Sequence, residues 1–171
     1  MRGFIQVYTG NGKGKTTAAL GLALRAFGAG KKVFIAQFIK GMHYSEIEAI
    51  NKSLPGISIK QFGLDCFIIN KPTKKDVKAA RLGLSEAYKI IATGDFDVVV
   101  LDEACIALYY KLFTVHELIR IIKAKPEAME IVITGRYAPA ELIELADLVT
   151  EMKEVKHYYK LGIEARKGIE F

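Results

Sequence analysis

The sequence predicts an α/β domain in which a mostly parallel sheet is flanked by helices. Strand patterns alternate with helical patterns along the chain, the segment "DVVVL" (97–101) is apolar on both faces, and no linker rich in Pro, Gly or Ser interrupts the series. Strands that alternate with helices form parallel sheets, whose strands are buried on both faces. We therefore expect residues 1–171 to form a single domain, long enough to bury a full core.

Strands are expected where short apolar runs are rich in β-branched and aromatic residues. In chain order these runs are residues 4–8, 32–39, 57–62, 97–101, 130–134 and 148–152.

The first helix is expected to begin at Lys15 and to stop at Gly28 or Gly30, because glycine readily takes the left-handed conformation that ends helices. A short helix over 140–146 follows Pro139, a residue suited to the first turn.

Capping-box patterns, in which a threonine is followed three residues later by an acid, predict the starts of two further helices. The pairs are Thr73 with Asp76 and Thr114 with Glu117, and Gly94 is a suitable end for the first of these helices.

Composition limits the classes of function. The net charge of +6 favours an anionic partner, which could be a nucleotide, a phosphate-bearing cofactor or a nucleic acid. Cys66 and Cys105 are far apart and belong to no metal-binding cluster, which argues against a disulfide framework or a zinc site. No apolar run is long enough for a membrane span or a secretory signal, so we expect a cytoplasmic protein without a membrane partner.

The segment "YTGNGKGKTTAAL" (8–20) lies between a predicted strand and a predicted helix. In that context a glycine-rich bend directs backbone N–H groups and a helix N-terminus at one phosphate, while Lys15 adds a charge and Thr16 a hydroxyl for magnesium. The alternative without a binding role is that these glycines form a simple turn and that Lys13 and Lys15 are solvated. The motif favours a single-domain P-loop NTPase fold of the RecA-like type. The residues expected to bind nucleotide here are Gly10, Asn11, Gly12, Lys13, Gly14, Lys15, Thr16 and Thr17.

Asp102 and Glu103 follow the buried strand 97–101. Ligands of open parallel sheets bind at the carboxyl ends of the strands, so this pair is expected near the phosphate loop. The metal ligands predicted are Thr16, Asp102 and Glu103, with a carboxylate holding the ion directly or through water. Acids at a solvated helix start are the alternative.

Three further segments narrow the function: "QFIKG" (37–41), "VITGRYAP" (132–139) and the tail "ADLVTEMKEVKHYYKLGIEARKGIEF" (146–171). Together with the phosphate loop and "VVVLDE" (98–103), they resemble the corrinoid adenosyltransferase family of P-loop proteins. The resemblance covers nearly the whole chain.

This resemblance implies transfer of the 5′-deoxyadenosyl group of ATP to cobalt(I) of a corrinoid, with tripolyphosphate as the leaving group. Lys15 and Glu103 would then be catalytic, and the metal would be Mg²⁺ or Mn²⁺. The family also implies nucleotide contacts from Arg25 and Arg136, although Arg25 could equally be an exposed helix residue. ATP would lie reversed relative to P-loop hydrolases, which fits Thr9 standing where the general motif has glycine.

The corrinoid side departs from the family pattern. Relatives use a Phe-x-Trp pair to exclude the lower cobalt ligand, but this chain has no Trp. Phe67 is the best candidate for that catalytic role, with Phe62 and Leu64 as helpers or core residues. A strand is expected from Phe4, so the N-terminal helical extension that covers the site in some relatives is not expected here. Closure of the site would then come from a partner subunit, the loop 41–55 or the tail. No histidine lies in a cobalt-ligand motif.

The family implies a homodimer. An electron-donating flavoprotein would reduce the cobalt of the corrinoid to cobalt(I). Two alternatives stay open: a RecA-like ATPase, and a non-catalytic ATP-dependent corrinoid carrier, suggested by the missing Trp. No nucleic-acid partner is expected, because the chain shows no motif that interleaves aromatic and basic residues.

Overall fold

In the computed structural model, which describes residues 2–64, 68 and 71–171, six strands form one sheet with the order β3-β2-β4-β5-β1-β6. All neighbouring strands in it are parallel. The strands are β1 (Ile5–Thr9), β2 (Val33–Phe38), β3 (Ile57–Phe62), β4 (Val98–Asp102), β5 (Glu130–Thr134) and β6 (Leu148–Glu151). The predicted parallel α/β fold is confirmed. The candidate Phe67 lies outside the described residues.

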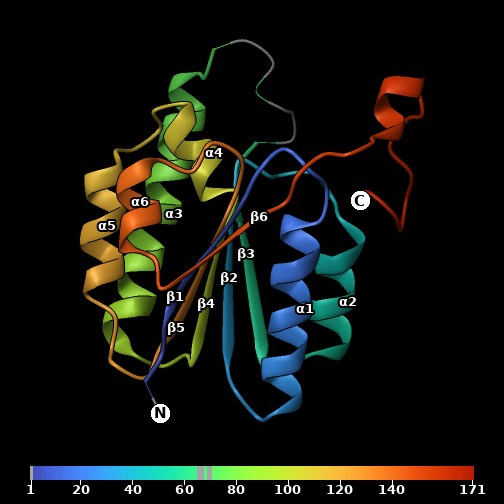
Figure 1. Cartoon of the computed structure of the whole chain (residues 1–171). Coiled ribbons are helices and arrows are strands. Elements are labelled where there is room, and N and C mark those ends of the chain that lie inside the picture. The colour runs from blue at the N-terminus through green and yellow to red at the C-terminus, as the bar shows by residue number, and fades with distance from the viewer. Residues whose placement is uncertain (1, 65–67, 69–70) are drawn as a thin grey trace.

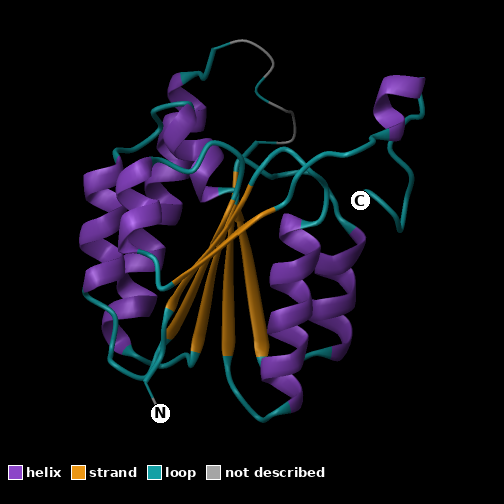
Figure 2. Cartoon of the chain, in the orientation of Figure 1, coloured by secondary structure: helices purple, strands orange, loops and turns teal. Residues whose placement is uncertain are grey.

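Helices cover both faces of the sheet (Figure 1). The α-helices are α1 (Lys15–Gly28), α2 (Ser45–Ser53), α3 (Lys74–Thr93), α4 (Ala104–Tyr109), α5 (Val115–Lys123) and α6 (Ala140–Leu145). The 3₁₀ helix η1 (Tyr158–Leu161) lies in the C-terminal tail, away from the sheet (Figure 1). Helices α1 and α2 lie on one face, and α3, α5 and α6 on the other, as Figure 2 also shows. Among the described residues, we find no helix with the length and apolarity needed to cross a bilayer.

The sheet separates two apolar cores. Phe34 and Leu101 point to the core beneath α3 and α5, while Ile35 and Val100 point to the core beneath α1 and α2. Every residue of β2 is buried because the strand lies between β3 and β4 and under helices on both faces. This framework fixes the carboxyl ends of β1, β2 and β4 at one edge of the sheet.

The predicted helix starts and ends agree with the structure at the capped positions. Both capping boxes are present, with Thr73 and Thr114 each accepting from the backbone N–H three residues on. Gly94 is left-handed after α3, as expected of a terminating glycine. The segment 41–55, expected to be a loop, instead contains α2, so that expectation is wrong over residues 45–53.

Candidate functional site

The phosphate loop connects β1 to α1 in a conformation that only glycine takes easily. Gly10 and Gly14 have φ of 94° and 118°, in the left-handed region. Gly12 lies against the chain just beyond β6, where its N–H donates to the Met152 carbonyl at 2.6 Å. A Cβ at Gly10 or Gly12 would crowd the Met152 backbone. The glycines therefore let the loop pack against the segment after β6.

Lys15 is buried at the start of α1, with 7% of its surface exposed. Its Nζ donates to the carbonyl oxygens of Gly10 and Gly12, both at 2.7 Å. Burial lowers the pKa of this ammonium, although the charges of Glu103 and Asp102 oppose that change. The loop thus closes around its own cation, whose three N–H groups could turn toward an incoming phosphate.

Asp102 ends β4 with a carboxylate that is 1% exposed. Its Oδ1 accepts from the hydroxyls of Thr16 at 2.9 Å and Thr134 at 2.6 Å. Its Oδ2 accepts from Lys40 Nζ at 2.8 Å and from Gln37 Nε2 at 3.3 Å. A buried carboxylate needs a cation and hydrogen bonds, and this one has both. The structure therefore brings Asp102 and Thr16 together, as predicted.

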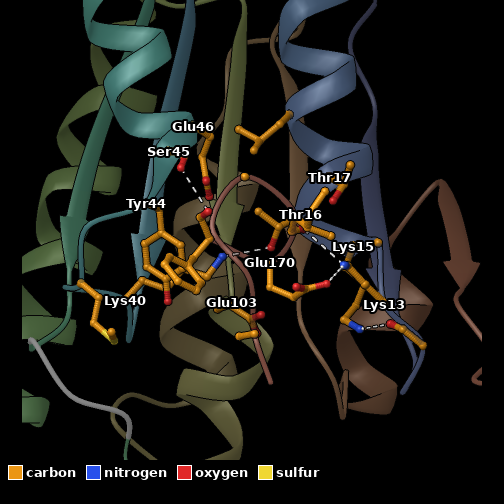
Figure 3. Close-up of a pocket in the computed structure, with 18 of the residues that line it drawn as sticks. Lys13, Lys15, Thr16, Thr17, Lys40, Tyr44, Ser45, Glu46, Glu103 and Glu170 are labelled. Atoms are coloured by element: carbon orange, nitrogen blue, oxygen red, sulfur yellow. Dashed lines mark hydrogen bonds and ion pairs between the residues drawn. The ribbon is translucent and has the colours of Figure 1, made fainter. Parts of the chain in front are cut away.

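Glu103, the next residue, has φ of 57° and caps α4. Its backbone N–H donates to Thr134 Oγ1 at 3.0 Å, and its side chain faces the cavity in Figure 3. Burial raises the pKa of Glu103, and the charge of Asp102 raises it further. A non-glycine residue held in this conformation is strained, and such strain is common at functional sites.

These residues border a cavity of about 660 Å³. Its walls come from the phosphate loop and the first residues of α1, from residues 40 and 42–46, from Glu103 and Arg136, and from His157 with the C-terminal residues. This volume is in the range of small-molecule sites. Seven of the residues expected to bind nucleotide lie at the cavity: Gly12, Lys13, Gly14, Lys15, Thr16, Thr17 and Arg136.

Three expected residues do not line this cavity. Gly10 accepts from Lys15 Nζ but is not part of the cavity wall. Asn11 is exposed on the phosphate loop outside the cavity wall. Arg25 is in the last turn of α1, ten residues or about 15 Å from Lys15 along the helix axis. Phe62, named as a helper, is buried between Phe38 and Gly83, which is a core position.

The C-terminal tail crosses the cavity from the phosphate loop to α2 (Figure 3). Lys13 Nζ pairs with Glu170 Oε1 at 2.6 Å and with the Tyr158 hydroxyl at 2.8 Å. The Ser45 hydroxyl donates to the Phe171 carbonyl at 3.1 Å. Arg166 and Lys13 hold the pKa of Glu170 well below its usual range. The tail therefore forms a wall of the cavity and places a carboxylate on a phosphate-loop lysine.

Sequence reasoning missed three residues of the site: Gln37, Lys40 and Thr134 all contact Asp102. Gln37 and Lys40 lie in "QFIKG" and Thr134 in "VITGRYAP", two of the segments on which the family resemblance rests. Cys105 is buried, and burial raises the pKa of its thiol to about 12, which disfavours the reactive thiolate.

A family model described as ATP:corrinoid adenosyltransferase BtuR/CobO/CobP matches residues 1–171. The chain belongs to this family. Among its relatives, the corrinoid adenosyltransferase of Pseudomonas aeruginosa is 39% identical over 171 residues, covering 99% of this chain and 84% of the relative. The corrinoid adenosyltransferase of Escherichia coli K12 is 36% identical over 170 residues, covering 99% of this chain and 86% of the relative.

The corrinoid adenosyltransferase CobA of Salmonella typhimurium is 35% identical over 170 residues. This family membership indicates an enzyme with ATP:corrinoid adenosyltransferase activity and ATP and a corrinoid as substrates. It favours neither the RecA-like ATPase nor the non-catalytic carrier.

Proposed function

We propose that the protein transfers the 5′-deoxyadenosyl group of ATP to cobalt(I) of a corrinoid and releases tripolyphosphate. The cobalt electron pair forms the bond to the ribose 5′-carbon, and the bond from that carbon to the triphosphate oxygen breaks with its electrons leaving on oxygen. The observation that carries this proposal is a phosphate loop with a buried Lys15 beside a paired carboxylate in a chain of this family.

The departing group is a growing polyanion, so the protein must stabilise negative charge rather than activate water. Lys15 is placed to do this once its ammonium leaves the carbonyls of Gly10 and Gly12. Lys13, Lys40 and Arg136 add positive charge around the same cavity. Adjacent N–H groups at the start of α1 complete the anion site.

Residues suited to Mg²⁺ lie at this position. The Thr16 hydroxyl, the Asp102 carboxylate and the Glu103 carboxylate are hard oxygen donors, which Mg²⁺ and Mn²⁺ prefer. Thr16 and Asp102 are already in contact, and Glu103 follows Asp102 directly. A bound ion would neutralise charge on the leaving triphosphate. We propose Thr16 and Glu103 as its ligands, with Asp102 binding directly or through water.

The proposed partners are a second copy of the chain and an electron-donating flavoprotein, and the proposed location is the cytoplasm, where ATP is abundant. The aromatic residue proposed to exclude the lower cobalt ligand is Phe67. Size measurement by light scattering would test the homodimer directly.

The decisive experiment incubates the protein with ATP, magnesium and chemically reduced cobalamin. We expect the cobalt(I) absorbance to fall, a light-sensitive adenosyl product to form, and tripolyphosphate to appear in equal amount. Lys15→Ala should abolish the reaction, whereas Lys60→Ala, which removes an exposed lysine of β3, should not. Orthophosphate without a cobalt–carbon bond would instead identify an ATPase.

A further inference from the structure

The Lys40 ammonium contacts two of the three groups proposed as metal ligands, Asp102 and Thr16. Its Nζ lies 2.8 Å from Asp102 Oδ2 and 3.1 Å from Thr16 Oγ1. The side chain is 14% exposed, and its partner Asp102 is 1% exposed. The protein therefore carries a cation of its own at the oxygen atoms where a divalent ion would bind.

The backbone that holds Lys40 in this position is strained. Ile39, which precedes it, has φ of 66°, a left-handed conformation that is unfavourable for a β-branched residue. A side chain at Gly63 would collide with the Ile39 carbonyl, and one at Gly41 would collide with the backbone of Leu64. Two glycines thus allow this strained bend to pack tightly against the segment after β3. Strain of this kind persists where the surrounding structure fixes it, often at a functional site.

The Lys40 side chain is held from a second direction by Tyr44. The Lys40 Nζ lies 5.4 Å from the centre of the Tyr44 ring, within the range of a cation–π contact. Both residues line the cavity, and Figure 3 shows them side by side near Glu103. The ammonium is therefore within reach of the cavity as well as of Asp102.

An ammonium and a divalent ion cannot both contact Asp102 Oδ2 and Thr16 Oγ1 without strong repulsion at this separation. We propose that Lys40 is a positioning residue, resting on the function proposed above: it occupies the metal position in the free protein, keeps Asp102 and Thr16 assembled, and moves to the triphosphate when metal and nucleotide arrive together. The free protein then binds metal weakly, and metal and ATP bind cooperatively.

The test measures binding of Mn²⁺ alone to the intact protein, from the electron paramagnetic resonance signal of free Mn²⁺. Lys40→Met removes the competing cation and leaves the buried Asp102 carboxylate without a partner charge until a metal ion binds. Mn²⁺ binding should therefore strengthen about tenfold or more. In the same variant, the affinity for ATP in the presence of magnesium should fall by about tenfold. Lys40→Arg, which keeps the charge, should bind free Mn²⁺ as weakly as wild type.

Three controls locate the effect. Lys60→Met makes the same chemical change in the exposed ion pair with Glu86 and should leave both affinities unchanged. Asp102→Asn in the Lys40→Met background should abolish the gain in Mn²⁺ affinity. Lys40→Gln gives a second, polar replacement if methionine prevents folding, and the same increase is expected.

Unchanged or weaker Mn²⁺ binding in Lys40→Met and Lys40→Gln would overturn the proposal and leave Lys40 as a purely structural ion-pair partner. These measurements contain no corrinoid, so they are independent of the adenosyl-transfer assay. Failure of the assay with normal metal competition would reject the proposed function alone.

Discussion

The folded protein disfavours ionisation of the Glu103 carboxyl group. Burial and the charge of Asp102 raise its pKa above the ordinary value of 4.5. The folded protein therefore holds this proton more tightly than the unfolded chain does. The contribution of the protonated group to the free energy of unfolding is full below pH 4.5 and is lost as the pH rises through the raised pKa.

Glu103→Gln cannot ionise, so the variant should gain stability relative to wild type as the pH rises above 4.5. Urea unfolding of both proteins at a series of pH values measures this difference. Glu86→Gln is the matched control, because Lys60 lowers the pKa of Glu86 and its removal cannot give a gain of the same sign. A stability difference between Glu103→Gln and wild type that is constant above pH 4.5 would contradict the expected burial effect. The same substitution should reduce adenosyl transfer about 100-fold, the typical loss when a group that stabilises the leaving charge is removed.

At the scale of elements, residues at the helix ends helped the sequence to reveal four helices: α1 and α6 through glycine and proline, and α3 and α5 through capping boxes. Helices α3 and α5 have capping boxes, and both were predicted from them. Helices α2 and α4 have no side-chain cap, and α2 buries only Ile50. A short helix without a cap or an apolar stripe leaves no local signal, since its stability comes from packing on the sheet. These two helices were accordingly not predicted from the sequence.

The capping box of α3 gives a direct measure of such a local signal. Thr73→Ala removes the hydroxyl that accepts from the Asp76 N–H, and the free energy of unfolding should fall by about 1 kcal/mol. Chemical denaturation measures the loss. Ser85→Ala, on the exposed side of the same helix, is the control and should cost nothing. Equal stability of Thr73→Ala and wild type would show that the cap does not stabilise the fold.

At the scale of the whole molecule, the sheet order assembles the site. Asp102 meets Thr16, Lys40 and Thr134, which lie 86, 62 and 32 residues away in the chain. The sequence placed Asp102 at a strand end near the phosphate loop, and that prediction was confirmed. It could not identify Lys40 and Thr134 as neighbours of Asp102, because that requires knowing that β4 lies between β2 and β5.

Four cationic side chains line the cavity: lysines 13, 15 and 40 and Arg136. We expect the affinity for ATP to fall several-fold between about 0.05 and 0.3 M NaCl, because salt screens the attraction of these cations for the triphosphate. Calorimetric titration measures the change. Adenosine, which lacks the phosphates, should bind with little dependence on salt, and an ATP affinity equally insensitive to salt would exclude an electrostatic role for these residues.

The close contact between the backbones of Gly63 and Ile39 connects the two sides of the proposed site. Ile39 leads to Lys40 on the nucleotide side, whereas the chain beyond Gly63 leads through Leu64 to the segment that contains Phe67, the candidate on the corrinoid side. Because these backbones are in close contact, a shift of Ile39 and Lys40 when ATP binds is expected to move Gly63 as well, which would couple ATP binding to corrinoid binding. The linkage is reciprocal: any factor by which ATP alters corrinoid affinity is the factor by which the corrinoid alters ATP affinity. A side chain at Gly63, which would collide with the Ile39 backbone, is therefore expected to change the affinities for both substrates together.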